Sequence, residues 1–153
     1  MKALLLSMIM VCLATAEVTA KAEEDDPIES ARAFFETYVE LEHAFDPALA
    51  GLYSDDAVIK NTRRYPTGQV RVLELPGARY KTLIREAMPL AKERGDKSTF
   101  SEVTIDLNES GSVTIRASRY SQLKDYTSPI EITVLPNGDG DWLIVKEESE
   151  SQP

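Results

Sequence analysis

The spacing of apolar residues changes near residue 99 from a helical period to a two-residue alternation, and this change constrains the fold most. Downstream of it, four segments alternate apolar with polar side chains, as half-buried strands do: 99–107, 112–120, 129–135 and 141–148. The turn at 108–111 and the sequence PNGDG at 136–140 predict hairpins between them. The second half of the chain is therefore predicted to form an antiparallel sheet.

Upstream of residue 99 the pattern is helical. Asp26-Pro27 and Asp46-Pro47 each combine an N-cap residue with proline at the first helical position, which predicts two helix starts. A third helix is predicted from about Tyr80, ending at Gly95. A short strand is predicted at 57–60, and the segment 69–75 could be a strand or an extended arm. Helices segregated from strands in this way indicate an α+β domain, with helices on one face of a curved sheet.

The first twenty residues have the order of a secretory signal. Lys2 precedes the apolar run 3–13, and small-residue exits follow at Ala16, Ala20 and Ala22. We expect cleavage after Ala20 or Ala22, which leaves a single domain over 21–153 in the periplasm or outside the cell. No later segment is long and apolar enough for membrane insertion.

Cysteine content and charge narrow the function classes. Cys12 is the only cysteine and lies in the predicted signal, so the mature chain is predicted to lack disulfides and thiolate chemistry. The formal net charge of −9 argues against nucleic acid as a partner. Much of the acidity lies at the ends, in 23–26 and 147–150, which we expect to be a solvated lead and a fraying tail.

Two motifs give the chain a resemblance to a known superfamily. They are YSDDAVIKN at 53–61, after the second helix, and NGDGDWLIVKEES at 137–149, around the last strand. With these two motifs in this order around a mid-chain helix, the chain resembles the nuclear transport factor 2-like (SnoaL-like) superfamily. Together with the predicted signal, the resemblance is to an exported bacterial member. The resemblance implies a cone-shaped sheet wrapped on about three helices, a cystatin-like roll, with a pocket between the first helix and the concave sheet face.

Within that superfamily, the ketosteroid isomerases are the most informative comparison. They need a carboxylate base, a tyrosine on the first helix and a second acid in the sheet. When SDDA is aligned, the resemblance places Asn61 at the base position, Tyr38 at the tyrosine and Glu131 nearest the sheet acid. An amide cannot accept the substrate proton, so this isomerase chemistry is not expected.

Two other features have simple structural explanations. Asp55 and Asp56 lie between helix and strand, where aspartates cap turns by accepting backbone N–H bonds, and we favour this reading over a catalytic pair. His43, the only histidine, lies off the apolar stripe beside acidic residues and is predicted to be at the surface. No metal site and no cofactor are predicted.

The candidate binding residues are aromatic, amide and arginine side chains. In a cone several tyrosines would line the cavity, although each could equally be an ordinary core aromatic. Arg63 and Arg64 follow the first strand and could pair with a ligand carboxylate or remain solvated. Arg116 and Tyr120 share a strand face; if that face is concave, Arg116 needs Glu131 or Glu147 as a partner, and if convex it faces solvent or a dimer partner. The predicted ligand-binding set is Tyr38, Tyr53, Asn61, Arg64, Tyr65, Arg116, Tyr120 and Trp142.

Three functions remain open from the sequence. The leading one is binding, without turnover, of a small apolar or aromatic molecule with a polar handle in the tyrosine-lined pocket. The alternatives are a lyase or isomerase that uses Tyr38 with a buried carboxylate such as Glu131, and a homodimeric interaction module that uses the outer sheet face. The enzyme alternative predicts a cavity carboxylate with a raised pKa.

Overall fold

The computed structural model describes residues 26–153. The predicted signal segment and its cleavage sites therefore lie outside the described residues. The elements, in chain order, are α1 (Pro27–Ala44), the 3-10 helix η1 (Pro47–Leu52), β1 (Tyr53–Arg64), β2 (Val70–Pro76), α2 (Gly77–Arg94), β3 (Ser98–Leu107), β4 (Val113–Ser121), β5 (Tyr126–Pro136) and β6 (Trp142–Ser151).

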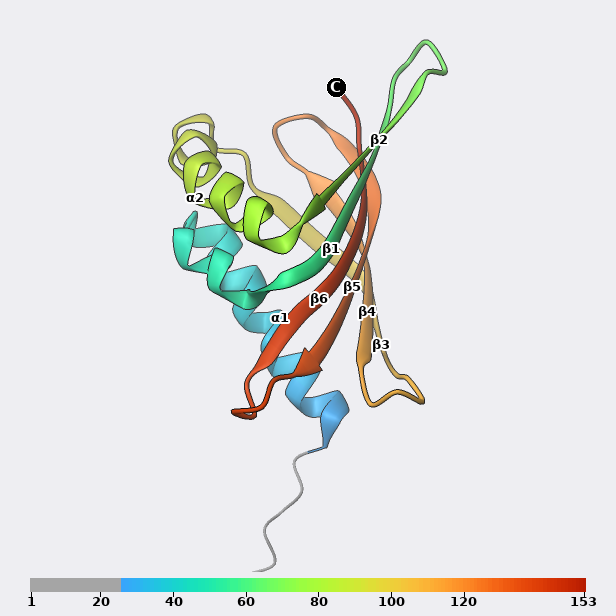
Figure 1. The fold of residues 1–153 in the computed structure, drawn as a ribbon. Helices are drawn as coiled ribbons and strands as arrows, with labels where there is room; N and C mark the ends of the chain where they lie inside the picture. The colour runs from blue at the N-terminus through green and yellow to red at the C-terminus, as the bar shows by residue number, and fades with distance from the viewer. Residues whose placement is uncertain (1–25) are drawn as a thin grey trace, which may run out of the picture.

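The six strands form one curved sheet in the order β2-β1-β6-β5-β4-β3. All neighbouring pairs are antiparallel except β1 and β6, which are parallel. Figure 1 shows both helices on the same side of this sheet, with the β1–β2 hairpin extending beyond it. The predicted α+β class is confirmed.

The sequence signals at the helix ends act as predicted. Asp26 caps α1 by accepting a hydrogen bond of 3.0 Å from the Ile28 amide, and Asp46 caps η1 through the Ala48 amide at 2.8 Å. Gly95 ends α2 in the left-handed region at φ 63°, where glycine has no Cβ penalty. Pro89 lies inside α2 without ending it.

The core lies between the helices and the inner face of the sheet, which is the face that the helices cover. Strand alternation turns one set of side chains inward, and α1 packs its apolar stripe against them. The largest fully buried apolar side chains of the core are Tyr53, Ile115, Ile132 and Ile144. No helix among residues 26–153 is long and apolar enough to cross a membrane.

Two sequence expectations about acidic residues are wrong. Asp55 and Asp56 lie within β1, at an irregularity in its pairing with β6, and Asp55 accepts a 2.7 Å bond from Lys81 Nζ. They were expected in a turn because the strand was expected to begin after them. The segment 147–150 is not a fraying tail: it lies in β6, between β1 and β5, and the central position of this strand buries Glu147.

Candidate functional site

A buried carboxylate lies at the centre of the inner face. Glu147 is 1% exposed, although it carries an ionisable group. Its Oε2 accepts a hydrogen bond of 2.5 Å from the hydroxyl of Tyr53, which is also 1% exposed. Burying a carboxylate is unfavourable unless hydrogen bonds or a countercharge compensate for the lost water. No ion pair to Glu147 is formed within residues 26–153, so the hydroxyl bond is its direct compensation.

Three tyrosines surround this carboxylate. Tyr53 packs edge-to-face against Tyr80 of α2, with ring centroids 5.2 Å apart. Tyr38 of α1 is 5% exposed and packs against Phe35 and Phe100 at 5.8 and 6.1 Å. The tyrosine cluster, defined here as Tyr38, Tyr53 and Tyr80, thus combines an apolar wall with phenol groups near Glu147.

Burial controls the ionisation of this cluster. Desolvation raises the pKa of Glu147, and the effects of Tyr53, Arg119 and Tyr80 oppose it only in part. Burial is also the main cause that raises the pKa of Tyr38 and of Tyr53, so both phenols stay protonated at neutral pH. The cluster can therefore donate hydrogen bonds and can hold a proton on a carboxyl group.

Polar residues continue along the inner face toward the ends of β1 and β6. Asn61 donates from Nδ2 to Ser149 Oγ at 3.0 Å and accepts at Oδ1 from Ser151 Oγ at 2.8 Å. Its amide is thus engaged by β6 on both atoms. Arg119 of β4 lies on the same face and donates from Nη2 to the backbone carbonyl of Glu150 at 3.2 Å.

Several predicted binding residues lie on the opposite, outer face. Arg116 donates to Glu131 at 2.8 Å and to Asp106 at 2.9 Å, and is half exposed. Tyr120 is exposed and donates to Asp125 at 2.7 Å. These side chains, with Arg64, cannot line a pocket between α1 and the sheet, because strand alternation turns them away from the helices.

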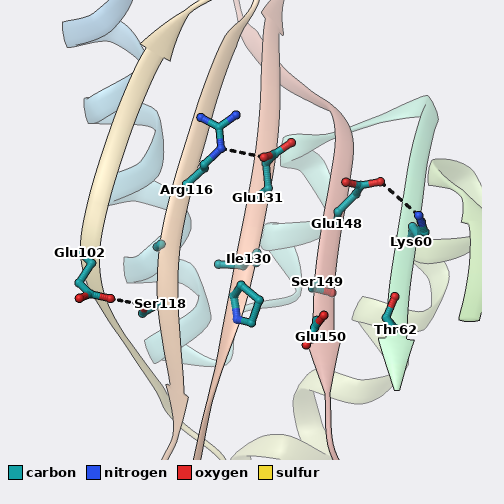
Figure 2. A pocket seen from close by; sticks show the side chains of 12 residues that line it. Lys60, Thr62, Glu102, Arg116, Ser118, Ile130, Glu131, Glu148, Ser149 and Glu150 are labelled. Carbon is teal, nitrogen blue, oxygen red and sulfur yellow. Dashed lines mark hydrogen bonds and ion pairs between the residues drawn. The ribbon is translucent and has the colours of Figure 1, made fainter. Parts of the chain in front are cut away.

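The outer face contains a hollow of about 490 Å³ across β1, β6, β5, β4 and β3. Figure 2 shows the helices behind the sheet and the side chains of this hollow in front of it. The charged side chains of this hollow form a network of ion pairs, among them Arg116 with Glu131 and Lys60 with Glu148 at 3.5 Å. Exposed pairs of this kind contribute little stability individually.

The remaining predicted residues occupy varied positions. Tyr65 follows β1 and stacks under the Arg63 guanidinium, with the Arg63 Cζ 5.5 Å from the ring centroid. Trp142 begins β6 and packs partly buried against the core. The Nε2 atom of His43 lies 2.6 Å from the Ser98 carbonyl, and the side chain is 41% exposed. Within residues 26–153, no three His, Cys, Asp or Glu side chains gather as metal ligands would.

Sequence reasoning did not place Glu147 or Arg119, two charged residues of the inner face, among the site residues. The acidic run at 147–150 concealed an alternation in which Glu147 and Ser149 face inward while Glu148 and Glu150 face outward. Arg119 lies two residues beyond Ala117 in the alternation Val113, Ile115, Ala117. Continuing the β4 alternation to the strand end would have indicated Arg119. It would not have indicated Glu147, because a register shift between Ile144 and Lys146 changes which residues of β6 face inward.

Comparisons with known proteins support the fold. No protein-family model and no curated protein matches the sequence. Among solved structures, an NTF-2 like protein of unknown function from Shewanella oneidensis MR-1 superposes with a TM-score of 0.63 at 16% identity, covering 82% of this chain and 100% of that one.

Two other solved structures are similar over comparable lengths. A candidate ketosteroid isomerase from Parabacteroides distasonis gives a TM-score of 0.56 at 14% identity, over 85% of this chain and 91% of that one. ActVI-ORFA from Streptomyces coelicolor gives 0.54 at 11% identity, over 80% and 95%. At such identities the likeness concerns the fold alone, and it matches the helices and curved sheet described above. The chain therefore has the nuclear transport factor 2-like fold.

Proposed function

We propose that this domain binds a small, mostly apolar molecule that has a polar handle, on the inner face between the helices and the sheet. One observation carries the proposal: the carboxyl group of Glu147, which is 1% exposed, lies among the tyrosine cluster within the core. Small-molecule sites in proteins combine apolar and aromatic walls with a few placed polar groups. Tyr38 and Phe100 supply such a wall, and the phenols and Glu147 supply polar groups.

Methyl NMR tests where a ligand binds. The domain would be titrated with indole, a neutral aromatic probe, and the methyl signals of the two sheet faces compared. Binding on the inner face shifts Ile84, Ala117 and Ile130, whereas the outer-face methyls of Val58 and Val72 stay in place. Native mass spectrometry after incubation with cell extract would seek a retained ligand. Shifts confined to the outer face, or no shift and no retained mass, would contradict the proposal.

A second candidate function is acid–base catalysis of the lyase or isomerase type. The observation that favours it is the raised pKa of Glu147 beside Tyr53 and Tyr38, since a general acid or base operates best with a pKa near the working pH. Glu131, the acid expected from the sequence, faces outward and pairs with Arg116, so Glu147 takes its place in this candidate. One solved structure of the same fold is a candidate ketosteroid isomerase.

The catalytic candidate has its own test. A β,γ-unsaturated ketone would be assayed for isomerisation by the native protein and by Glu147→Gln and Glu131→Gln variants. Turnover that falls with Glu147→Gln and persists with Glu131→Gln is the expected result. Equal turnover in all three proteins would exclude Glu147 as the acid or base.

Export and self-association also remain proposals. The predicted signal would be tested by N-terminal sequencing of the protein from a periplasmic or culture fraction, with a start at Lys21 or Glu23 expected. Association would use the outer face, where Val58 and Val72 are exposed beside the charged hollow. Light scattering of the native protein and a Thr133→Arg variant, which places a charge on that face, tests it. A native monomer would contradict it.

A further inference from the structure

Three arginines lie in one row across the inner face of the sheet. In the strand register, Arg71 on β2 is opposite Arg63 on β1, and Arg63 is opposite Ser151 on β6. On the far side of β6, Arg119 on β4 is opposite Ser128 on β5. We call Arg71, Arg63 and Arg119 the arginine row. Directly opposed like charges are unfavourable in a sheet. Arg71 is exposed and can be solvated, whereas Arg63 is partly buried and needs an explanation.

No carboxylate in the described part of the chain forms a close ion pair with these arginines, although the charge of Glu147 acts on Arg119 from a longer distance. Within residues 26–153, none approaches a guanidinium nitrogen of the arginine row to 4.0 Å. The outward-facing Arg64 and Arg116, by contrast, are both paired, at 2.7 and 2.8 Å. In a chain with a net charge of −9, unpaired inward arginines are not explained by a shortage of acidic residues.

Two buried polar atoms in this row lack a hydrogen-bond partner. Arg63 Nε is inaccessible to solvent, and so is the hydroxyl oxygen of Ser128, whose residue is 5% exposed. Buried polar groups in folded proteins are almost always paired, since an unpaired one is unfavourable. Arginine cannot relieve the problem by losing its proton. Both atoms can donate to the same kind of partner, an oxygen acceptor.

The Arg119 side chain extends toward Arg63. Its Nη2 donates to the carbonyl of Glu150 on β6, although Arg119 belongs to β4 and β5 lies between the two strands. The guanidinium therefore lies over β6, which is the strand beside Arg63. Ser128, opposite Arg119 on β5, is under this path. The two guanidinium groups thus approach the same part of the inner face from opposite sides.

We propose that the arginine row, with Ser128, is an oxyanion site, and that the polar handle of the bound molecule is a carboxylate. This inference rests on the proposed binding function and specifies its ligand class. Planar guanidinium groups match the geometry of carboxylate oxygens and form charge-assisted bonds with them. Leu73, opposite Asn61 on the same face and 48% exposed, offers an apolar surface beside Arg63 for the rest of the molecule.

The test compares benzoate with benzamide, its neutral analogue, on the native protein. The Nε–Hε NMR signals of arginine would be followed in each titration, with inorganic phosphate as a second anion. We expect benzoate to shift the signals of Arg63 and Arg119 while those of Arg64 and Arg116 remain unchanged. Benzamide should bind at least about tenfold more weakly, since it lacks the charge that strengthens the bonds. If phosphate binds more tightly than benzoate, the result would overturn the carboxylate as the polar handle and indicate a phosphate group instead.

Variants separate this inference from the proposed function. Arg63→Gln and Arg119→Gln should each weaken benzoate binding by about tenfold or more, whereas the outer-face controls Arg64→Gln and Arg116→Gln should leave it unchanged. Arg63→Gln is the safer variant if Arg119→Gln fails to fold, because Arg119 also donates a hydrogen bond to the Glu150 carbonyl. Equal binding of benzoate and benzamide on the inner face would overturn the oxyanion site and leave ligand binding intact. No response to indole, benzoate or phosphate would overturn both.

Discussion

The hydroxyl of Tyr53, at the start of β1, donates a 2.5 Å hydrogen bond to the carboxyl group of Glu147 in β6, 94 positions later in the chain. Both residues are 1% exposed, so water does not compete for this bond. A hydrogen bond in such surroundings matters mainly because leaving its acceptor unpaired is costly. Because β1 and β6 are the two parallel strands, this hydrogen bond joins them at the polar centre of the inner face.

Removal of the Tyr53 hydroxyl should destabilise the fold. Tyr53→Phe leaves the ring in place and deprives Glu147 of its direct donor, so we expect the free energy of unfolding to fall by about 1–3 kcal/mol. Urea denaturation followed by tryptophan fluorescence measures it. Tyr120→Phe is the matched control, because Tyr120 also donates to a carboxylate, Asp125, but is exposed. A loss in Tyr120→Phe equal to that in Tyr53→Phe would contradict the role given to burial.

Stability should fall as pH rises through the ionisation of Glu147. Its pKa in the folded protein lies above the ordinary value of 4.5, so the folded state holds this proton more tightly than the unfolded state. The resulting stabilisation is fully present below pH 4.5 and is lost as pH rises through the raised pKa. Each unit of pKa difference corresponds to about 1.4 kcal/mol.

Glu147→Gln isolates this effect, since glutamine keeps an acceptor for Tyr53 and cannot ionise. We expect the variant to become more stable relative to the native protein as pH rises from about 4 to 8. The pKa of Glu42 is also raised by burial, but this residue is present in both proteins and cancels in the comparison. A stability difference that stays constant with pH would show that the pKa of Glu147 does not change on folding.

The first residue of α2 should tolerate only glycine. A Cβ on Gly77 would lie 2.0 Å from the Ser54 carbonyl oxygen and 3.0 Å from the Ala57 Cβ, so α2 would have to move away from β1. Gly77→Ala should therefore lower the free energy of unfolding by about 1–3 kcal/mol or more. A Cβ on Gly51 meets nothing within 4 Å, which makes Gly51→Ala the control. Thermal unfolding of both variants measures the difference, and equal melting temperatures would refute it.

Substitutions at two adjacent residues of β4 should differ greatly in how much they lower the free energy of unfolding. Arg116 forms its ion pairs while 50% exposed, so Arg116→Ala should change the free energy of unfolding by less than about 1 kcal/mol, with a smaller effect in high salt. Ala117 is 7% exposed in the core, and Ala117→Asp should prevent folding or destabilise by several kcal/mol, about 3 or more. Circular dichroism with denaturation would compare them. Similar losses would mean that the two faces of β4 are not distinct.

Much of the fold could be predicted from local signals. The caps at Asp26 and Asp46, the end of α2 at Gly95 and the alternation from Val113 to Ala117 each act through neighbouring residues, so the sequence contains them directly. The parallel pairing of β1 with β6 is different. It joins residues far apart in the chain, and no local pattern specifies which strand lies beside β1.

The site was less predictable for the same reason. Arg116 and Arg119 lie three residues apart in β4 and therefore on opposite faces, and the apolar alternation of the strand assigns Arg119 to the core face. The alternation does not show which residues of the other strands lie beside either arginine. In the sequence, Glu147 cannot be distinguished from the acidic residues beside it. Only the central position of β6 in the sheet shows that Glu147 is buried. Tyr38 was singled out through the resemblance, and the structure places it in the core, 5% exposed and near the buried carboxylate.

The central place of β6 has a consequence for synthesis of the protein. Because residues 142–151 are synthesised after the other five strands, the strands on either side of them, β1 and β5, have unpaired edges until β6 has emerged from the ribosome. Unpaired strand edges are templates for association with other chains, and distant pairings form slowly. The nascent sheet is therefore most prone to aggregate just before β6 emerges. Truncation of that segment would divide the sheet into two hairpin-based halves instead of trimming an edge.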